Sequence, residues 1–165
     1  MYFIDFPLEI VTSIQEVDVD TLKCHEEVVE NRLVSFFDYL KTLDGDILIS
    51  SIIVCDETMI IIDGHHRYHA LKKFGLKKIP VTFVKYNSPE IKAYYDDRIL
   101  KSDIINNVKR GRIFPAKSSK HVIFDSKSKA YMPILLLSSV WHVNLKLLPW
   151  INDFEILNKP ILSKN

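Results

Sequence analysis

Residues 60–71 read IIIDGHHRYHAL, an apolar run that breaks into a polar cluster and then takes on helical spacing. The three isoleucines predict a buried strand, Gly64 permits a tight turn, and the apolar spacing from Tyr68 predicts a helix that ends before Gly75. The turn would lie at the N-terminus of that helix, where free backbone N–H groups and the helix dipole attract anions. We therefore predict a phosphate site at this turn.

The side chains of the turn support the same prediction. His65, His66 and Arg67 can add hydrogen-bond donors, and Asp63 would place a carboxylate beside the phosphate. Like charges repel unless a metal ion or a transferred proton lies between them. A single histidine on such a turn is more often an ordinary polar residue, but four successive polar or glycine positions favour a binding site.

Composition restricts the class of protein. The chain has 165 residues, 22 of them basic and 21 acidic, with a formal net charge of +1. This length suits one domain with a real core, and the balanced charge argues against nucleic-acid or membrane partners. Two cysteines are too few for a disulfide framework, so we expect a cytoplasmic protein with reduced thiols.

The two ends of the chain give further expectations. Met1–Glu9 lacks the basic leader of a signal peptide, and the apolar segment Ala130–Leu145 is shorter than the roughly 20 residues that a membrane-spanning helix needs. We expect residues 1–126 to form one domain. Residues 127–165 would form an apolar extension that packs on the same domain or makes a contact in a homo-oligomer.

Helical and strand-like segments alternate along the chain. Because they are interleaved, we predict the α+β class, with a small mixed β-sheet flanked by helices. The expected helices are Glu26–Leu43, Tyr68–Phe74 and two pieces within Ser88–Val108, and the expected strands are Ile47–Cys55, Met59–Ile62, Ile79–Val84 with Pro80 at its start or at an edge, and Val122–Phe124.

Three polar groups stand out, and they are far apart in the sequence. They are His25–Glu27, Asp63–Arg67 and the basic tract Lys109–His121. If they converge, they supply what phosphoryl transfer needs: a carboxylate to deprotonate a hydroxyl, donors for phosphates, and a second anion site for the acceptor.

Each group also has a simpler interpretation. Glu26 and Glu27 are typical of acids in the first turn of a helix, where each contributes about 0.3 to 1 kcal/mol. The basic tract is compatible with a nucleic-acid patch or a solvated loop, although only Phe114 could stack on a base. Zinc binding is disfavoured, because adjacent histidines point in different directions and no second ligand pair is present.

Together the motifs resemble a known family. The run DGHHR followed by ALxxxG is similar to the ParB/sulfiredoxin superfamily, and within it to the free L-serine kinases. Leu22–Glu27 resembles their Lys-Pro-His-Glu segment, and Val108–Val122 resembles their closing segment Lys-Arg-Gly-x-x-Phe-x-Pro-Lys-Thr-Thr-Arg-His-Val. The resemblance covers Leu22–Phe124 and implies a ParB/sulfiredoxin-like fold.

The resemblance also implies an activity and a role for each matching residue. It implies transfer of a phosphoryl group from ADP or ATP to the hydroxyl of free L-serine or a close analogue, giving O-phosphoserine in amino-acid metabolism, with Mg²⁺ on the phosphates. By this match the catalytic residues are Glu26, as the base, and Asp63, which orients acceptor and phosphate; the nucleotide phosphates are gripped by Gly64, His65, His66 and Arg67; and the acceptor carboxylate is held by Lys117, Ser119, Lys120 and His121.

The chain also departs from the family. Lys120 stands where the family has arginine, and lysine cannot form the two parallel hydrogen bonds that arginine makes to a carboxylate. In addition, Cys24 replaces a proline, and Ala116 is an additional residue between Pro115 and Lys117. Sulfiredoxins carry a reactive cysteine where this chain has His65, which disfavours sulfinic-acid repair. The alternative function is a nucleotide-binding ParB-like regulatory module that acts on a protein or DNA partner, with Lys127–Asn165 as its contact surface.

Overall fold

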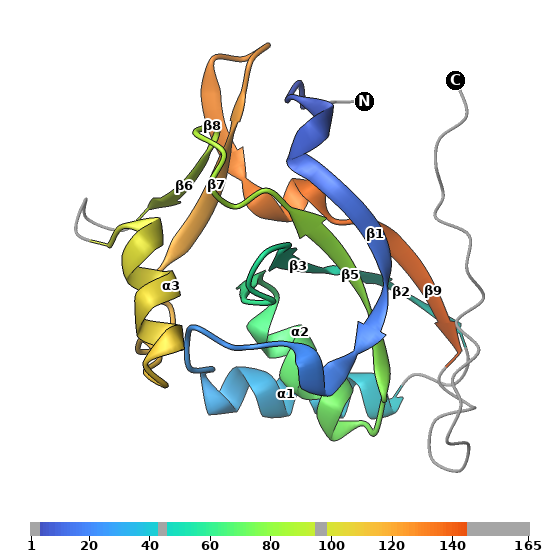
Figure 1. Cartoon of the computed structure of the whole chain (residues 1–165). Helices are drawn as coiled ribbons and strands as arrows, with labels where there is room; N and C mark the ends of the chain where they lie inside the picture. Colours follow the sequence, from blue (N-terminus) through green and yellow to red (C-terminus); the bar gives the residue numbers. More distant parts are fainter. Residues whose placement is uncertain (1–3, 43–45, 95–98, 145–165) are drawn as a thin grey trace.

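The computed structural model describes residues 4–42, 46–94 and 99–144 (Figure 1). In chain order the strands are β1 (Val11–Asp18), β2 (Asp46–Ser50), β3 (Ile52–Cys55), β4 (Ile61–Asp63), β5 (Lys78–Val84), β6 (Ile91–Tyr94), β7 (Lys120–Asp125), β8 (Ala130–Pro133) and β9 (Val140–Asn144). The α-helices are α1 (Glu30–Thr42), α2 (His65–Lys73) and α3 (Lys101–Lys109), and the 3-10 helices are η1 (Leu8–Ile10), η2 (Val19–Thr21) and η3 (Ile134–Leu137).

The central sheet has the strand order β1-β5-β3-β4. β1 runs antiparallel to β5, β5 runs parallel to β3, and β3 forms the predicted hairpin with β4 across the turn at 56–58. The remaining strands form a β2-β9 pair and a β6-β7-β8 sheet. Mixed sheets flanked by helices confirm the predicted α+β class.

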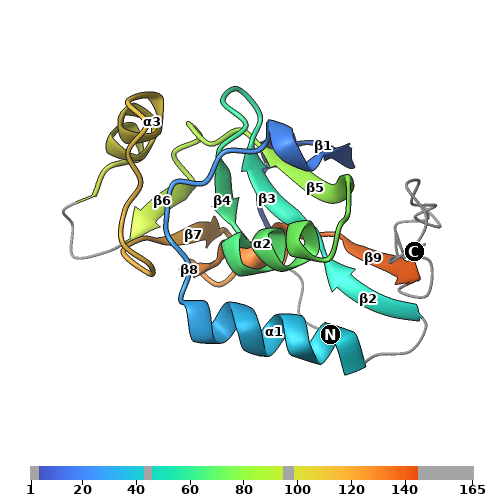
Figure 2. The same cartoon turned by 90° about the horizontal axis from the view of Figure 1, so that it is seen from below.

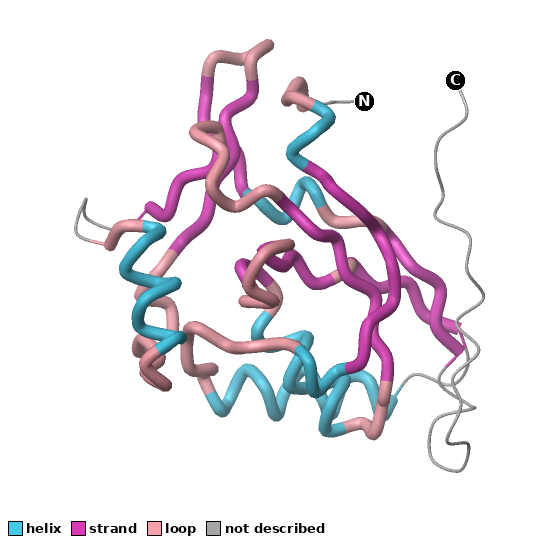
Figure 3. The backbone as a smooth tube through the Cα atoms, viewed as in Figure 1, coloured by secondary structure: helices cyan, strands magenta, loops and turns pink. Residues whose placement is uncertain are grey.

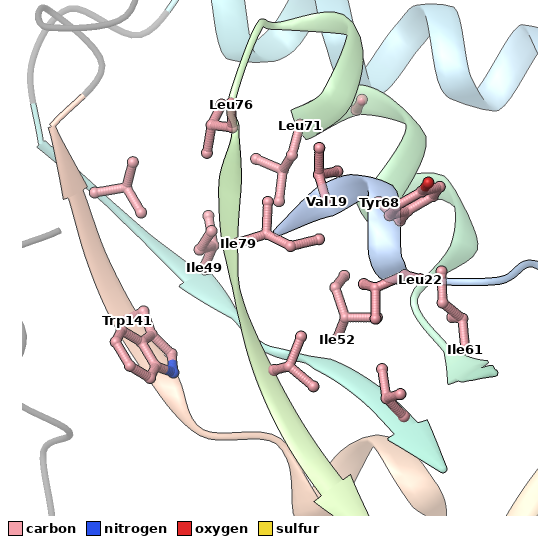
Figure 4. Close-up of a cluster of buried hydrophobic side chains, with 14 of the residues drawn as sticks. Val19, Leu22, Ile49, Ile52, Ile61, Tyr68, Leu71, Leu76, Ile79 and Trp141 are labelled. Atoms are coloured by element: carbon pink, nitrogen blue, oxygen red, sulfur yellow. The ribbon is translucent and has the colours of Figure 1, made fainter. Parts of the chain in front are cut away.

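The central sheet is buried on both faces, because successive side chains of a strand point to opposite sides. Ile52 and Val54 of β3 join a core with α1, α2 and β9, whereas Ile53 and Cys55 join a second core with α3, β7 and η3. Figure 4 shows the first core, in which Tyr68 and Leu71 of α2 face the sheet. This packing fixes α2, and with it the polar turn that precedes the helix.

Helices α1 and α2 lie side by side on one face of the central sheet, as Figure 2 shows from below. None of the helices in the described ranges is long and apolar enough to cross a membrane. Residues 130–144 of the expected extension form β8, η3 and β9. Strand β8 pairs with β7, and β9 pairs with β2. Residues 145–165 lie outside the described residues.

Two predicted boundaries were wrong near the start of the chain. α1 begins at Glu30, so Glu26 and Glu27 precede it and are not acids of its first turn. Their backbone is held instead by a parallel bridge between Glu26 and Phe114. The predicted strand 47–55 divides at Ser51, because Ser51 bonds the backbone of Ser139 and the chain passes there from one sheet to another.

Two further predictions concern the second half. Pro80 lies in an interior strand, but near its start, where β5 pairs only with β1 and the pairing with β3 begins at Val81. Two helical pieces were expected within Ser88–Val108, and α3 is the one that forms among the described residues of this range. Ile91–Tyr94 is strand β6 instead, because it pairs with β7 and tertiary pairing overrides its local preference.

Candidate functional site

The turn between β4 and α2 depends on Gly64. Its φ of 102° lies in the left-handed region, which side chains disfavour, and an added Cβ would come within 3.0 Å of both Arg67 and Ile52. Gly64 caps α2, and the first N–H groups of a helix have no partner within it. The predicted phosphate turn therefore has the local structure expected of an anion site.

The guanidinium of Arg67 braces this turn from within the protein. It forms an ion pair with Asp63, with 2.8 Å between Arg67 Nη2 and Asp63 Oδ2, and it donates to the carbonyl of Ser50 at 2.9 Å. Burial raises the pKa of the Asp63 carboxyl, and the charge of Arg67 opposes that rise. Arg67 contacts only one oxygen of Asp63, Oδ2, and Asp63 lines the pocket described below.

The two histidines of the turn contact the segment before α1. His66 Nε2 accepts the N–H of Val29 at 3.1 Å, so a side chain of α2 caps the start of α1. His65 is buried, and its pKa lies well below the ordinary value because of that burial and of nearby histidines, His25 first among them. His65 is therefore neutral at neutral pH and stabilises the turn without adding positive charge.

Glu26 reaches the same place from a remote part of the chain. Figure 3 shows the loop before α1 running beside the loop that follows α3, where the backbone N–H of Phe114 donates to His25 at 2.8 Å. The Glu26 side chain is only 8% exposed. Its Oε1 accepts the N–H of Lys117 at 2.6 Å, and its Oε2 accepts the N–H of Ser119 at 3.0 Å and lies 2.9 Å from the Ser119 hydroxyl oxygen.

The loop that holds Glu26 is itself strained. Lys117 has a φ of 60°, which is uncommon for a residue with a side chain. This conformation aims the Lys117 N–H at Glu26, and strained backbone of this kind gathers at functional sites. Lys117 and Ser119, two of the four residues expected to hold an acceptor carboxylate, thus contact the Glu26 carboxylate here.

Another buried histidine, His121, lines the pocket. His121 Nε2 is 2.8 Å from the Tyr86 hydroxyl, and the other ring nitrogen forms a hydrogen bond with the backbone of Ile62. Burial, with smaller contributions from His25 and Lys101, lowers the pKa of His121 to about 3. His121 is therefore a neutral wall of the site.

These segments surround one pocket of about 690 Å³, a size typical of small-molecule sites. All ten site residues predicted from the sequence line it, together with His25, Arg32, Ser50, Ile62 and Pro133–Leu135. Sequence reasoning missed Arg32, because an arginine on the exposed side of a helix resembles ordinary surface charge. Within the described ranges, no three His, Cys, Asp or Glu side chains gather as metal ligands.

An apolar pocket of about 480 Å³ adjoins the first one, because Ser50 and Arg67 line both. Its other walls come from α1 and β2, namely Phe36, Tyr39, Leu40, Ile47, Leu48 and Ile49. The site thus combines a polar chamber with an apolar one.

Several known proteins resemble this chain in sequence and in fold. No protein-family model matches the chain. The ATP-dependent L-serine kinase of Staphylothermus marinus is 29% identical over 156 residues, which are 90% of this chain and 60% of that protein. The ADP-dependent L-serine kinase of Thermococcus kodakarensis is 29% identical over 97 residues, which are 57% of this chain and 40% of that protein.

The chain is thus similar in sequence to curated L-serine kinases, in one case over 90% of its length. The resemblance of its motifs to that family is thereby confirmed. A solved free serine kinase in complex with AMP shares the fold, with a TM-score of 0.59 and 15% identity over 74% of this chain and 91% of that chain. The chain spans 60% and 40% of the lengths of the two curated relatives.

Proposed function

We propose that the protein is a small-molecule kinase that transfers a phosphoryl group from ADP or ATP to the hydroxyl of free L-serine, giving O-phosphoserine. One observation carries the proposal: the Glu26 carboxylate lines the same pocket as the N-terminal turn of α2, although the two are remote in sequence. A nucleotide-binding switch would have no need of a carboxylate base at that place.

The donor phosphates would lie at the turn before α2. Backbone N–H groups of residues 64–67 and the helix dipole supply the anion site, and Arg32, Lys117 and Lys120 add positive charge from other sides of the pocket. The base of the nucleotide would enter the adjoining apolar pocket. Phe36 and Tyr39 offer aromatic faces there for stacking.

Glu26 would remove the proton from the acceptor hydroxyl as its oxygen attacks phosphorus, while the bond to the leaving nucleotide breaks. Asp63 would orient the hydroxyl and the transferred phosphoryl group. Lys117 and Lys120 would attract the acceptor carboxylate through charge, and Ser119 and His121 would shape that end of the pocket.

Mg²⁺ fits the donor set of this pocket. The ion prefers phosphate oxygens, water and one or two carboxylates to a cage of protein ligands, and the free oxygen of Asp63 offers one such carboxylate beside the turn. When bound, the ion neutralises phosphate charge. The relatives named for ATP and for ADP leave both donors in the proposal.

The direct test is incubation of the protein with L-serine, Mg²⁺ and either ADP or ATP, followed by detection of O-phosphoserine. Formation of this product with one of the two donors is the expected result. Absence of product with both donors, in protein that still binds a nucleotide by calorimetry, would favour the regulatory module over the kinase.

A further inference from the structure

The side chains of His25, Ser119 and Glu26, the proposed base, form a continuous row. His25 Nε2 lies 2.7 Å from Ser119 Oγ, and Ser119 Oγ lies 2.9 Å from Glu26 Oε2. His25 is 1% exposed and Glu26 8% exposed, so the row is largely shielded from water. The proposed function uses Glu26 and Ser119 but assigns no role to His25.

The orientation of the His25 ring fixes which of its nitrogens carries hydrogen. Nδ1 lies 2.6 Å from the carbonyl oxygen of Ile61. A carbonyl oxygen can only accept, so Nδ1 must donate. Burial lowers the pKa of His25, which keeps the ring neutral at neutral pH. Nε2 therefore has a free lone pair that can accept a hydrogen bond from Ser119.

Ser119 then faces two acceptors with a single hydrogen. Its hydroxyl can donate to His25 Nε2 or to Glu26 Oε2, and the shorter contact is the one to His25. While the hydrogen points to His25, a lone pair of Ser119 Oγ faces the Glu26 carboxylate. A hydrogen bond to a carboxylate weakens it as a base, so withholding this one strengthens it. A proton that arrives on Glu26 also relieves the contact between the two oxygens.

We propose that His25 is a positioning residue that draws the Ser119 hydrogen away from Glu26 and so strengthens Glu26 as the proton acceptor. The inference rests on the proposed function. In the reaction the acceptor proton moves to Glu26 as the new oxygen–phosphorus bond forms and the bond to the leaving nucleotide breaks. The Ser119 hydrogen stays on Ser119, and the Glu26 proton is later released to solvent.

Other charges also act on this row, and they come from every neighbouring element. Glu26 and then Asp63 favour the charged form of His25, and the rings of His65 and His121 lie 4.5 and 5.4 Å from the His25 ring. The groups that face the row are Arg32 of α1, Asp63 of β4, His65, His66 and Arg67 of α2, Lys117 of the loop, and Lys120 and His121 of β7. None of these groups comes between His25 and Ser119, so substitution of His25 tests the row itself.

His25→Asn tests the proposal, because asparagine keeps a donor for Ile61 and loses the acceptor at Nε2. Ser119 would then donate to Glu26. A stabilised carboxylate stays ionised to lower pH, so the acid limb of the pH dependence of kcat should move down by about one pH unit, while the plateau falls about tenfold. His25→Gln, which restores an acceptor near Nε2, should recover part of the rate.

Ser119→Ala supplies the coupling test, and Ser118→Ala is its matched control. The proposal requires that His25→Asn has little further effect on the acid limb of the pH dependence of kcat when Ser119→Ala is already present. The Ser118 hydroxyl is buried and has no hydrogen-bond partner among the described residues, so Ser118→Ala should leave the limb in place. Additive effects of the His25 and Ser119 substitutions, or a reduced rate with an unmoved limb, would overturn the proposal.

A readout without turnover separates this inference from the proposed function. In protein with ¹⁵N-labelled imidazole nitrogens, Ser119→Ala should change the NMR chemical shift of His25 Nε2, because that nitrogen no longer accepts a hydrogen bond. An Nε2 signal that does not change on this substitution would show that the hydroxyl donates to Glu26 and would overturn the inference. If Nε2 responds but no phosphoserine forms with either donor, the proposed function fails and the hydrogen-bonded row stands.

Discussion

The α2 half and the Glu26 half of the pocket are built in different ways. The α2 half is one continuous segment, Asp63–Arg67, whose shape follows from a glycine, a helix start and an ion pair four residues apart. The Glu26 half joins two loops through the bridge of Glu26 with Phe114 and through the N–H groups of Lys117 and Ser119. The proposed anion site therefore depends on local geometry, whereas the placement of the proposed base depends on tertiary contacts.

Glu26→Gln should have the largest effect and should separate the two halves. A general base contributes about 10²- to 10⁴-fold to a rate, so turnover should fall by about that factor. Nucleotide affinity, measured by calorimetry, should change little, because the α2 half remains intact.

Glu27→Gln is the matched control, because Glu27 is exposed and contributes only backbone to the bridge. It should keep both activity and affinity. Equal losses of turnover and nucleotide affinity in Glu26→Gln would mean that Glu26 only holds the two loops together.

Gly64→Ala attacks the α2 half and should have the next largest effect. A side chain at a φ of 102° costs about 1–3 kcal/mol, and the Cβ would press on Arg67 and Ile52. Nucleotide binding should be lost, and the free energy of unfolding in urea should fall by about that amount.

Gly75→Ala separates strain from site, because Gly75 also has a positive φ, of 97°, but an added Cβ would meet no atom within 4 Å. It should lower stability while nucleotide binding persists. If Gly75→Ala weakened nucleotide binding as much as Gly64→Ala, loss of stability and not loss of the turn would be the cause.

The difference between the halves also explains how far the sequence could predict the molecule. The order of strand, turn and helix from β4 to α2 was predicted correctly, because apolar spacing and Gly64 act over a few residues, although α2 begins at His65 and not at the predicted Tyr68. The bridge between Glu26 and Phe114 could not be predicted, since it joins distant segments and has no local signal. For the same reason, the sequence indicated helix at Glu26, and its family match for Ser119 gave no sign of the contact with Glu26.

Acidification should destabilise the fold through its buried histidines. His121 has a pKa of about 3 in the folded protein, because of burial, against about 6.5 when unfolded. The unfolded chain alone takes up this proton between those values, so stability is full above pH 6.5 and falls as the pH drops toward 3. One such proton changes the free energy of unfolding by at most about 1.4 kcal/mol per pH unit. Burial lowers the pKa values of His25 and His65 as well, which adds to the slope.

Urea unfolding at several pH values between 7.5 and 4.5 checks this slope. His121→Gln should reduce the slope of unfolding free energy against pH, because one proton fewer is taken up on unfolding. The glutamine amide can still bond Tyr86 and Ile62. A slope that stays the same in His121→Gln would show that other groups drive acid unfolding. Nucleotide binding should persist to lower pH than turnover does, because in the proposal the α2 half would hold the phosphate through backbone N–H groups, which do not titrate.

Tyr39→Ala should have the smallest effect and extends the comparison to the apolar pocket. Stacking of a base on an aromatic ring contributes about 1–3 kcal/mol, and the 56% exposure of Tyr39 favours the lower end of that range. ADP affinity should therefore fall about fivefold, while affinity for inorganic tripolyphosphate, which has no base, stays unchanged. Tyr131→Ala is the matched control, because Tyr131 is a similarly exposed tyrosine that packs on Phe124 and lines neither pocket. If Tyr39→Ala lowered the affinities for ADP and for tripolyphosphate equally, Tyr39 would not contact the base. Helix α1 would then support the phosphate turn, and the apolar pocket would serve only as structural support for the α2 half.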